Sequence, residues 1–174
     1  CAASALAPLC KLRTLRTLSL ERNRLSEVPA LIGTMLSLRR LLLHSNQIVE
    51  LPSTLCLLSS LEVLDLHKNL ITTLPHSIGK LVALQKLDIS ENKLTELPIS
   101  ICELNETLQL SVGRNPLEKP SVEQARQGVG SIRRYFGFTR SKDSADGAGT
   151  DQVEASGAAS DEVAAAKRQL PLRA

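Results

Sequence analysis

The sequence predicts an α/β solenoid: a curved stack of coils with parallel strands on the concave face and short helices or turns on the convex face. Two observations predict this fold. First, asparagine recurs every 23 residues, at Asn23, Asn46, Asn69, Asn92 and Asn115. Second, each asparagine lies in the same frame of apolar residues, which in the third copy is Leu61, Leu64, Leu66, Asn69, Ile71, Leu74 and Pro75. A fixed period of about 20–29 residues with this frame is typical of stacked repeats.

The strands are predicted from a leucine alternation within each copy. A Leu-x-Leu pair indicates a short strand that buries one face, and neighbouring copies should lie about 4.8 Å apart as a parallel sheet. No copy can enclose its own leucines, so the core forms only between neighbours. The whole frame, Leu-x-x-Leu-x-Leu-x-x-Asn-x-Leu, is the signature of leucine-rich repeats. The inward pairs are Leu18 and Leu20, Leu41 and Leu43, Leu64 and Leu66, and Leu87 and Ile89.

The asparagine column is predicted to be structural. After each strand the backbone turns inward, and its amide and carbonyl groups lose their strand partners. An unsatisfied buried polar group costs about 1–3 kcal/mol. An asparagine side chain both donates and accepts, so it can satisfy groups of its own turn and of the neighbouring one. We therefore expect these asparagines to hold the stack together and not to bind a ligand.

The return segments begin with prolines and should form short helices. Proline fixes φ and lacks a donor, which suits a chain that leaves a strand. The apolar residues that follow, such as Ile32 and Met35, predict about two turns of helix packed on the strands. The prolines are Pro29, Pro52, Pro75 and Pro98.

One column of the return segments holds small residues and indicates the compartment. Cys10, Cys56 and Cys102 alternate there with Gly33 and Gly79. Cysteines two copies apart should lie about 10 Å from each other, beyond the roughly 7 Å between Cα atoms that a disulfide allows. We expect buried free thiols and a reducing, cytoplasmic location. No apolar run approaches the ~20 residues of a membrane span.

The pattern changes at both ends of the repeats. Residues 1–14 match part of a truncated repeat, and residues 15–120 hold five repeats. In the fifth, Thr107 stands where leucine is expected. Residues 121–138 predict one capping helix with Ser121 as its N-cap and aromatic residues as a lid. Residues 139–174 are rich in small and acidic residues and predict a disordered tail.

Composition weighs against several functions. The chain is 43% hydrophobic but only 2% aromatic, and its net charge of +3 is too small to indicate nucleic-acid binding. No catalytic or cofactor motif is present, so we expect no enzyme, no cofactor and no metal. His44 and His67, next to each other in one column and beside Asp65 and Asp88, are the only residues that suggest a metal or acid–base pair. No sequence motif supports that interpretation.

The outward strand residues are the candidate binding surface. They would line the concave face, where Leu42 is apolar among polar neighbours. Leu42 is either an interface anchor or an ordinary surface leucine. The residues predicted to contact a partner are Arg40, Leu42, His44, Asp65, His67, Lys86 and Asp88.

The end of the repeats resembles a known family. The run Asn115-Pro116-Leu117, followed by Pro120, Glu123, Gly128, Ile132, Tyr135 and Phe136, resembles the closing segment of intracellular leucine-rich repeat proteins. With 23-residue repeats that end in Leu-Pro, residues 9–138 resemble the Ras-group-related set. The resemblance implies a surface for protein contact, small GTPases or phosphatases as partners, and no catalytic residues.

The sequence therefore predicts a protein-interaction module: a cytoplasmic signalling scaffold or adaptor with a protein partner on the concave face and no nucleic-acid partner. In its full-length form we expect a monomer. The chief alternative is the recognition domain of a larger signalling enzyme, a kinase, ubiquitin ligase or GTPase. A purely structural role without a partner is the third hypothesis.

Overall fold

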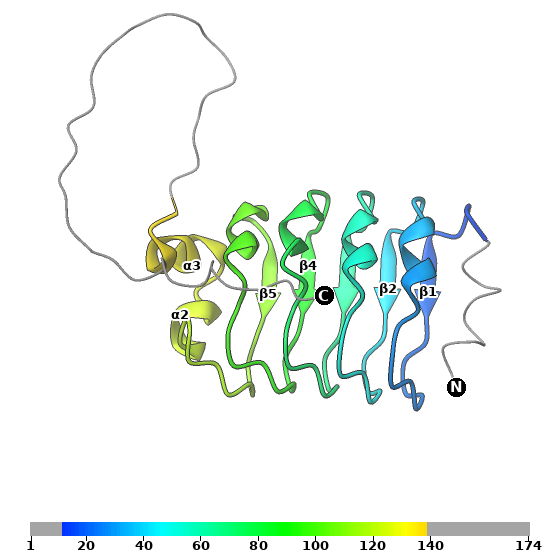
Figure 1. Cartoon of the computed structure of the whole chain (residues 1–174). Coiled ribbons are helices and arrows are strands. Elements are labelled where there is room, and N and C mark those ends of the chain that lie inside the picture. Colours follow the sequence, from blue (N-terminus) through cyan, green and yellow to red (C-terminus); the bar gives the residue numbers. More distant parts are fainter. Residues whose placement is uncertain (1–11, 139–174) are drawn as a thin grey trace, which may run out of the picture. The chain divides into compact units, whose positions relative to one another are not determined.

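The computed structural model describes residues 12–138, which form a stack of coils built on one parallel sheet. Five three-residue strands lie side by side in chain order (Figure 1). Every residue of a strand pairs with the residue 23 positions later, so the sequence period is also the register of the sheet. The strands are β1 (Thr17–Ser19), β2 (Arg40–Leu42), β3 (Val63–Asp65), β4 (Lys86–Asp88) and β5 (Gln109–Ser111).

The core is a continuous aliphatic layer beneath the sheet. Leu41, Leu64 and Leu87, the central residues of three neighbouring strands, are completely buried. Leu18, at the first strand, is 7% exposed. Because each coil covers the leucines of the next, the inner coils bury their leucines more completely than the first one does.

The predicted asparagine ladder is confirmed, and its geometry explains the constant spacing of 23 residues between asparagines. Asn69 Nδ2 donates to Leu43 O of the preceding coil at 3.0 Å and to Leu66 O of its own coil at 2.9 Å. Its Oδ1 accepts from Ile48 N of the preceding coil at 3.1 Å. Asn46, Asn92 and Asn115 make equivalent bonds. Each asparagine thus joins two coils.

Asn23 differs from the other four because it is exposed. Its Nδ2 donates to Leu20 O and Glu21 O, both in its own turn. Among residues 12–138 there is no earlier coil for it to join.

The return segments are short helices, as predicted, and they are of the 3₁₀ type. Met35 N donates to Ile32 O, an i to i−3 bond that is repeated in each segment. The 3₁₀-helix rises about 2.0 Å per residue against 1.5 Å for the α-helix, so it carries the chain back with fewer residues. The segments are η2 (Ala30–Thr34), η3 (Ser53–Leu57), η4 (Ile78–Lys80) and η5 (Ile99–Glu103).

The small-residue column lies where neighbouring return segments meet. Gly33, Cys56, Gly79 and Cys102 are all buried. A Cβ atom on Gly79 would lie 2.3 Å from Ser100 O, and one on Gly33 would lie 2.4 Å from Thr54 O. The backbones of neighbouring return segments therefore pass close to each other at the two glycines.

The fifth coil keeps its leucine layer by a shift of one residue. Thr107, expected at the leucine position, is exposed, whereas Leu108 is 5% exposed and packs in the core. Leu108 N donates to Asn105 O, so the chain turns one residue later than in the fourth coil, where Leu84 N donates to Leu81 O. The loss of leucine at position 107 therefore leaves no hole.

The cap consists of two helices and not of the single helix that was predicted. Ser121 is the N-cap of α2 (Val122–Arg126), as expected, and forms a capping box with Gln124. The chain then breaks at Gly128, which has a φ of 89°, and α3 (Val129–Phe136) follows. This φ lies in the region that glycine adopts without steric cost, which is why the glycine stops the first helix.

The cap closes the stack with aliphatic side chains and one buried arginine. Val129 and Ile132 are fully buried, Phe136 and Phe138 pack partly against the core, and Tyr135 is 42% exposed. Arg133 is only 7% exposed. It donates to Cys102 O at 2.7 Å and Leu104 O at 2.8 Å and pairs with Glu106. The aromatic lid was thus predicted only in part, and the arginine was not anticipated.

The predicted repeat remnant up to Lys11, with Cys10, and the predicted tail at 139–174 lie outside the described residues. Within the described range, no helix is long and apolar enough to cross a membrane.

Candidate partner-binding surface

The residues predicted to contact a partner all lie on one side of the sheet. We use the name strand face for the outward side chains of β1–β5 together with the next outward residue after each strand. This next residue is His44 after β2 and His67 after β3. Arg40 and Lys86 are exposed there. The others are partly buried: Leu42, His44, Asp65, His67 and Asp88. Strand alternation places them, because Leu41, Leu64 and Leu87 between them point into the core.

Leu42 is one of two apolar residues on β2–β4 of this surface; the other, Val63, lies beside Arg40 in the row before it. In the sheet register it lies between Ser19 on β1 and Asp65 on β3. Along its own strand Arg40 and His44 flank it on the same face. An apolar side chain ringed by polar and charged ones has the composition of an interface anchor.

Two histidines stack next to this leucine, as their column predicts. The ring centroids of His44 and His67 are 4.6 Å apart, and the rings are inclined by 20°. His44 Nε2 lies 3.5 Å from Glu21 Oε2, and His67 Nδ1 donates to Asp65 Oδ1 at 3.0 Å. A carboxylate therefore stands beside each ring. Glu21 was missed as a site residue, although it occupies the same column one coil before His44.

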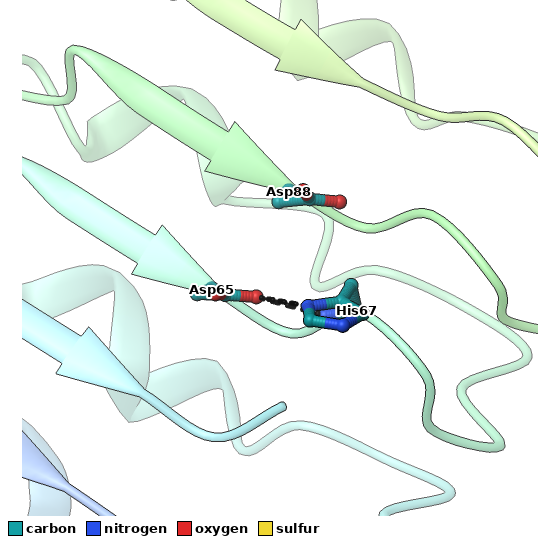
Figure 2. A group of neighbouring side chains, drawn as sticks. All are labelled: Asp65, His67 and Asp88. Atoms are coloured by element: carbon teal, nitrogen blue, oxygen red, sulfur yellow. Dashed lines mark hydrogen bonds and ion pairs between the residues drawn. The ribbon is translucent and has the colours of Figure 1, made fainter. Parts of the chain in front are cut away.

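The two aspartates follow each other across neighbouring strands. Asp65 and Asp88 are paired in the register of β3 and β4. Asp65 Oδ1 accepts from His67 N at 3.2 Å, and Asp88 Oδ1 accepts from Ser90 N at 3.0 Å and from Ser90 Oγ at 2.6 Å. Both carboxylates thus shape the turn that ends their own strand. Figure 2 shows Asp65, His67 and Asp88 gathered at the ends of these strands.

The turn after each strand relies on one residue with a left-handed backbone. Lys68 has a φ of 57° and comes directly after His67 and before Asn69. The same conformation recurs at Arg22, Ser45, Glu91 and Arg114. The ladder asparagine fixes this turn through its carbonyl bonds, which holds the outward histidine in a defined position.

The comparisons with known proteins agree with the fold. A family model for the leucine rich repeat matches residues 36–94 and 59–117. A leucine-rich repeat protein from Leptospira interrogans is similar in structure, with a TM-score of 0.59, 32% identity and 68% of this chain covered. The fold is a leucine-rich repeat solenoid. No curated protein matches the sequence.

Two plant receptor complexes are also similar in structure. The Arabidopsis receptor kinase HAESA, in complex with the peptide hormone IDA and the co-receptor SERK1, is 33% identical over 62% of this chain, with a TM-score of 0.54. The plant peptide hormone receptor RGFR1, in complex with RGF2, is 26% identical over 63% of this chain, with a TM-score of 0.58.

This leucine-rich repeat chain spans a minor part of each of these structures. It covers 36% of the Leptospira protein, 19% of HAESA and 18% of RGFR1. Their likeness therefore bears on the repeat architecture and on the kind of surface that it presents.

Proposed function

We propose that this leucine-rich repeat solenoid is an intracellular protein-interaction module, a signalling scaffold or adaptor that holds a protein partner on its strand face. The observation that carries the proposal is the position of Leu42. It is the apolar centre of a face whose other predicted contact residues are charged or imidazole side chains. Apolar anchors surrounded by polar groups supply most of the affinity in protein interfaces.

The charges of the strand face indicate the chemistry of the partner. Arg40 and Lys86 are exposed in one outward row of the sheet, and Asp65 and Asp88 lie with Leu42 in the next row. A partner that fits would present one apolar side chain to Leu42, with basic and acidic groups on either side. HAESA and RGFR1, which are similar in fold, are seen with peptide hormones, and this supports a peptide or protein ligand. The resemblance to Ras-group-related proteins favours a small GTPase or a phosphatase.

The thiols support a reducing, cytoplasmic location. Cys56 and Cys102 are buried and unpaired. Burial raises the pKa of both thiols above the ordinary value. Because the same fold also forms the ectodomain of the receptor kinase SOBIR1, we argue the compartment from these thiols and not from the fold.

The test of the strand face is affinity capture with matched variants. Leu42→Glu places a charge at the proposed anchor, and Asp65→Arg reverses a charge beside it. We expect each to reduce recovery of the captured partner by about tenfold or more, because each removes a contact at the centre of the interface. Leu57→Glu is the control, since Leu57 is 55% exposed on η3 and lies outside the strand face. Recovery should be unchanged for this variant.

Two outcomes contradict the proposal. Equal recovery with the native chain, Leu42→Glu and Asp65→Arg would exclude the strand face. A loss confined to Leu57→Glu would move the interface to the 3₁₀ side. Circular dichroism of each variant, with a spectrum like that of the native chain, establishes that the fold is intact.

The alternative function is the recognition domain of a larger signalling enzyme. It is favoured by the similarity to HAESA, a receptor kinase of which this chain covers 19%. A catalytic domain encoded next to these repeats would establish the alternative, whereas further repeats alone would support the scaffold.

A further inference from the structure

We propose that Asp65, His67 and Asp88 form a binding site for a divalent metal ion on the strand face. One ligand atom from each of the three residues lies within 4.8 Å of the other two (Figure 2). Two atoms bound to one ion at about 2.2 Å can be at most about 4.4 Å apart. Small side-chain rotations therefore bring all three within bonding distance. All three residues belong to the proposed partner-contact set, but the metal site does not depend on the partner proposal.

The hydrogen bonds of the aspartates leave one oxygen of each available. Every bond to Asp65 and Asp88 within residues 12–138 goes to Oδ1. The Oδ2 atoms have no donor in this part of the chain. A carboxylate that uses one oxygen to fix its turn and keeps the other free is already oriented for a ligand role.

The histidine presents Nδ1 to the aspartates. Because a carboxylate only accepts, the 3.0 Å contact makes His67 Nδ1 the donor to Asp65. An ion held by both residues takes the place of that proton, which moves to Nε2, since either ring nitrogen of histidine can carry the proton or bind a metal.

The charges around the cluster are an independent reason to expect a cation. Elsewhere in the stack, residues 23 positions apart form pairs of opposite charge, as Arg39 does with Glu62 and Arg114 with Glu91. Asp65 and Asp88 have the same spacing but the same charge, and no lysine or arginine of residues 12–138 pairs with either. Like charges directly opposite each other in a sheet are destabilising. A divalent cation would turn this repulsion into attraction.

The ligand set indicates the class of metal. Two carboxylates and one imidazole suit Mn²⁺, Fe²⁺, Co²⁺ or Zn²⁺, whereas thiolates are the ligands that select softer ions. Sequence motifs for metal sites place the ligands a few residues apart in one segment. The set of Asp65, His67 and Asp88 matches none of these motifs. It arises because the register brings Asp88 beside Asp65 from the next coil.

Mn²⁺ titration of the full 174-residue chain tests the site. Mn²⁺ is the probe because the thiols of the chain bind it poorly. The loss of the free Mn²⁺ signal in electron paramagnetic resonance should saturate at one ion per chain. Asp88→Asn keeps an acceptor for Ser90 but removes the charge, and His67→Gln removes the imidazole. Each should weaken Mn²⁺ binding by about tenfold or more.

His76→Gln is the matched control, because His76 is an exposed histidine outside the strand face, and its Mn²⁺ affinity should equal that of the native chain. Lowering the pH should weaken binding to the native chain, since metal ligands must be deprotonated.

No saturable binding up to about 1 mM Mn²⁺, the weak end for sites of this kind, would overturn the proposal. So would equal affinity for the native chain and for folded Asp88→Asn and His67→Gln. Since Leu42→Glu leaves the ligands in place, loss of partner capture with Mn²⁺ binding intact separates this site from the interface.

Discussion

At the scale of single residues, each of the buried ladder asparagines joins two coils. Asn69 bonds the carbonyls Leu43 O and Leu66 O, which it shares with Asn46 and Asn92, and it accepts from Ile48 N. Its side chain is 5% exposed, so water cannot replace these bonds. The column was predictable because only a short side chain that both donates and accepts meets this requirement.

Asn69→Ala tests the ladder. The substitution leaves Ile48 N without a partner, and one unsatisfied buried group costs about 1–3 kcal/mol. Leu43 O and Leu66 O each lose one of two donors, because Asn46 and Asn92 still donate to them. We expect the free energy of unfolding to fall by about 1–3 kcal/mol in urea denaturation. Asn23→Ala is the control, because Asn23 is exposed and bonds only within its own turn. It should cost about 1 kcal/mol or less. Equal losses would mean that the ladder bonds do not set the stability.

Other residues could not be assigned a role from the sequence. Arg133 follows an ordinary helical pattern, and nothing local shows that its guanidinium reaches Cys102 O and Leu104 O about thirty residues earlier in the chain. In the same way, His44 and His67 were predicted to be neighbours, but their pairing with Glu21 and Asp65 depends on rotamers. The period specifies which residues share a face, and side-chain packing decides which of them touch.

At the scale of elements, the strands were predictable, and the return segments were predictable as short helices but not as the 3₁₀ type. The strands follow from the Leu-x-Leu alternation, which admits one burial pattern. The return segments have apolar residues at spacings that fit either an α-helix or a 3₁₀-helix. The distance that the chain must span before the next strand selects the 3₁₀ form. The cap was similarly predicted as one helix because its apolar stripe is continuous, whereas Gly128 divides it.

Two glycines test the packing of these elements. Gly79→Ala would place Cβ 2.3 Å from Ser100 O and 2.7 Å from Glu103 Cβ, so η4 and η5 would have to separate. We expect a loss of about 1–3 kcal/mol in the free energy of unfolding. Gly130→Ala in α3 is the matched control, since nothing lies within 4 Å of its added Cβ. It should stabilise the protein by up to about 1 kcal/mol through helix propensity. A neutral Gly79→Ala in a urea or thermal melt would contradict the close approach.

At the scale of the whole molecule, the hydrophobic core of the described stack is shared between neighbouring coils. Leu64 has a strand on each side and is fully buried, whereas Leu18 has one strand beside it and is 7% exposed. The same residue type in the same frame therefore contributes differently according to its place in the stack.

Leucine truncations measure this dependence on position. Leu64→Ala should lower the free energy of unfolding by about 2–5 kcal/mol, the range for a fully enclosed leucine. Leu18→Ala should cost clearly less, because the cavity it leaves opens toward the end of the described stack. Chemical denaturation of the two variants in parallel gives the comparison. Indistinguishable denaturation midpoints would contradict the prediction that a leucine's contribution depends on its place in the stack.

The bridging amides also determine how this molecule could be lengthened or shortened. Asn46, Asn69, Asn92 and Asn115 each accept from a backbone amide of the coil before them. A cut between two coils therefore leaves polar groups without hydrogen-bond partners on both sides. A graft of one complete 23-residue unit would restore every bond and extend the surface by one strand. A graft one residue longer or shorter would place the next amide out of register with the groups that it bonds. The molecule is therefore modular in whole coils, and the amide spacing sets the rule for any engineered version.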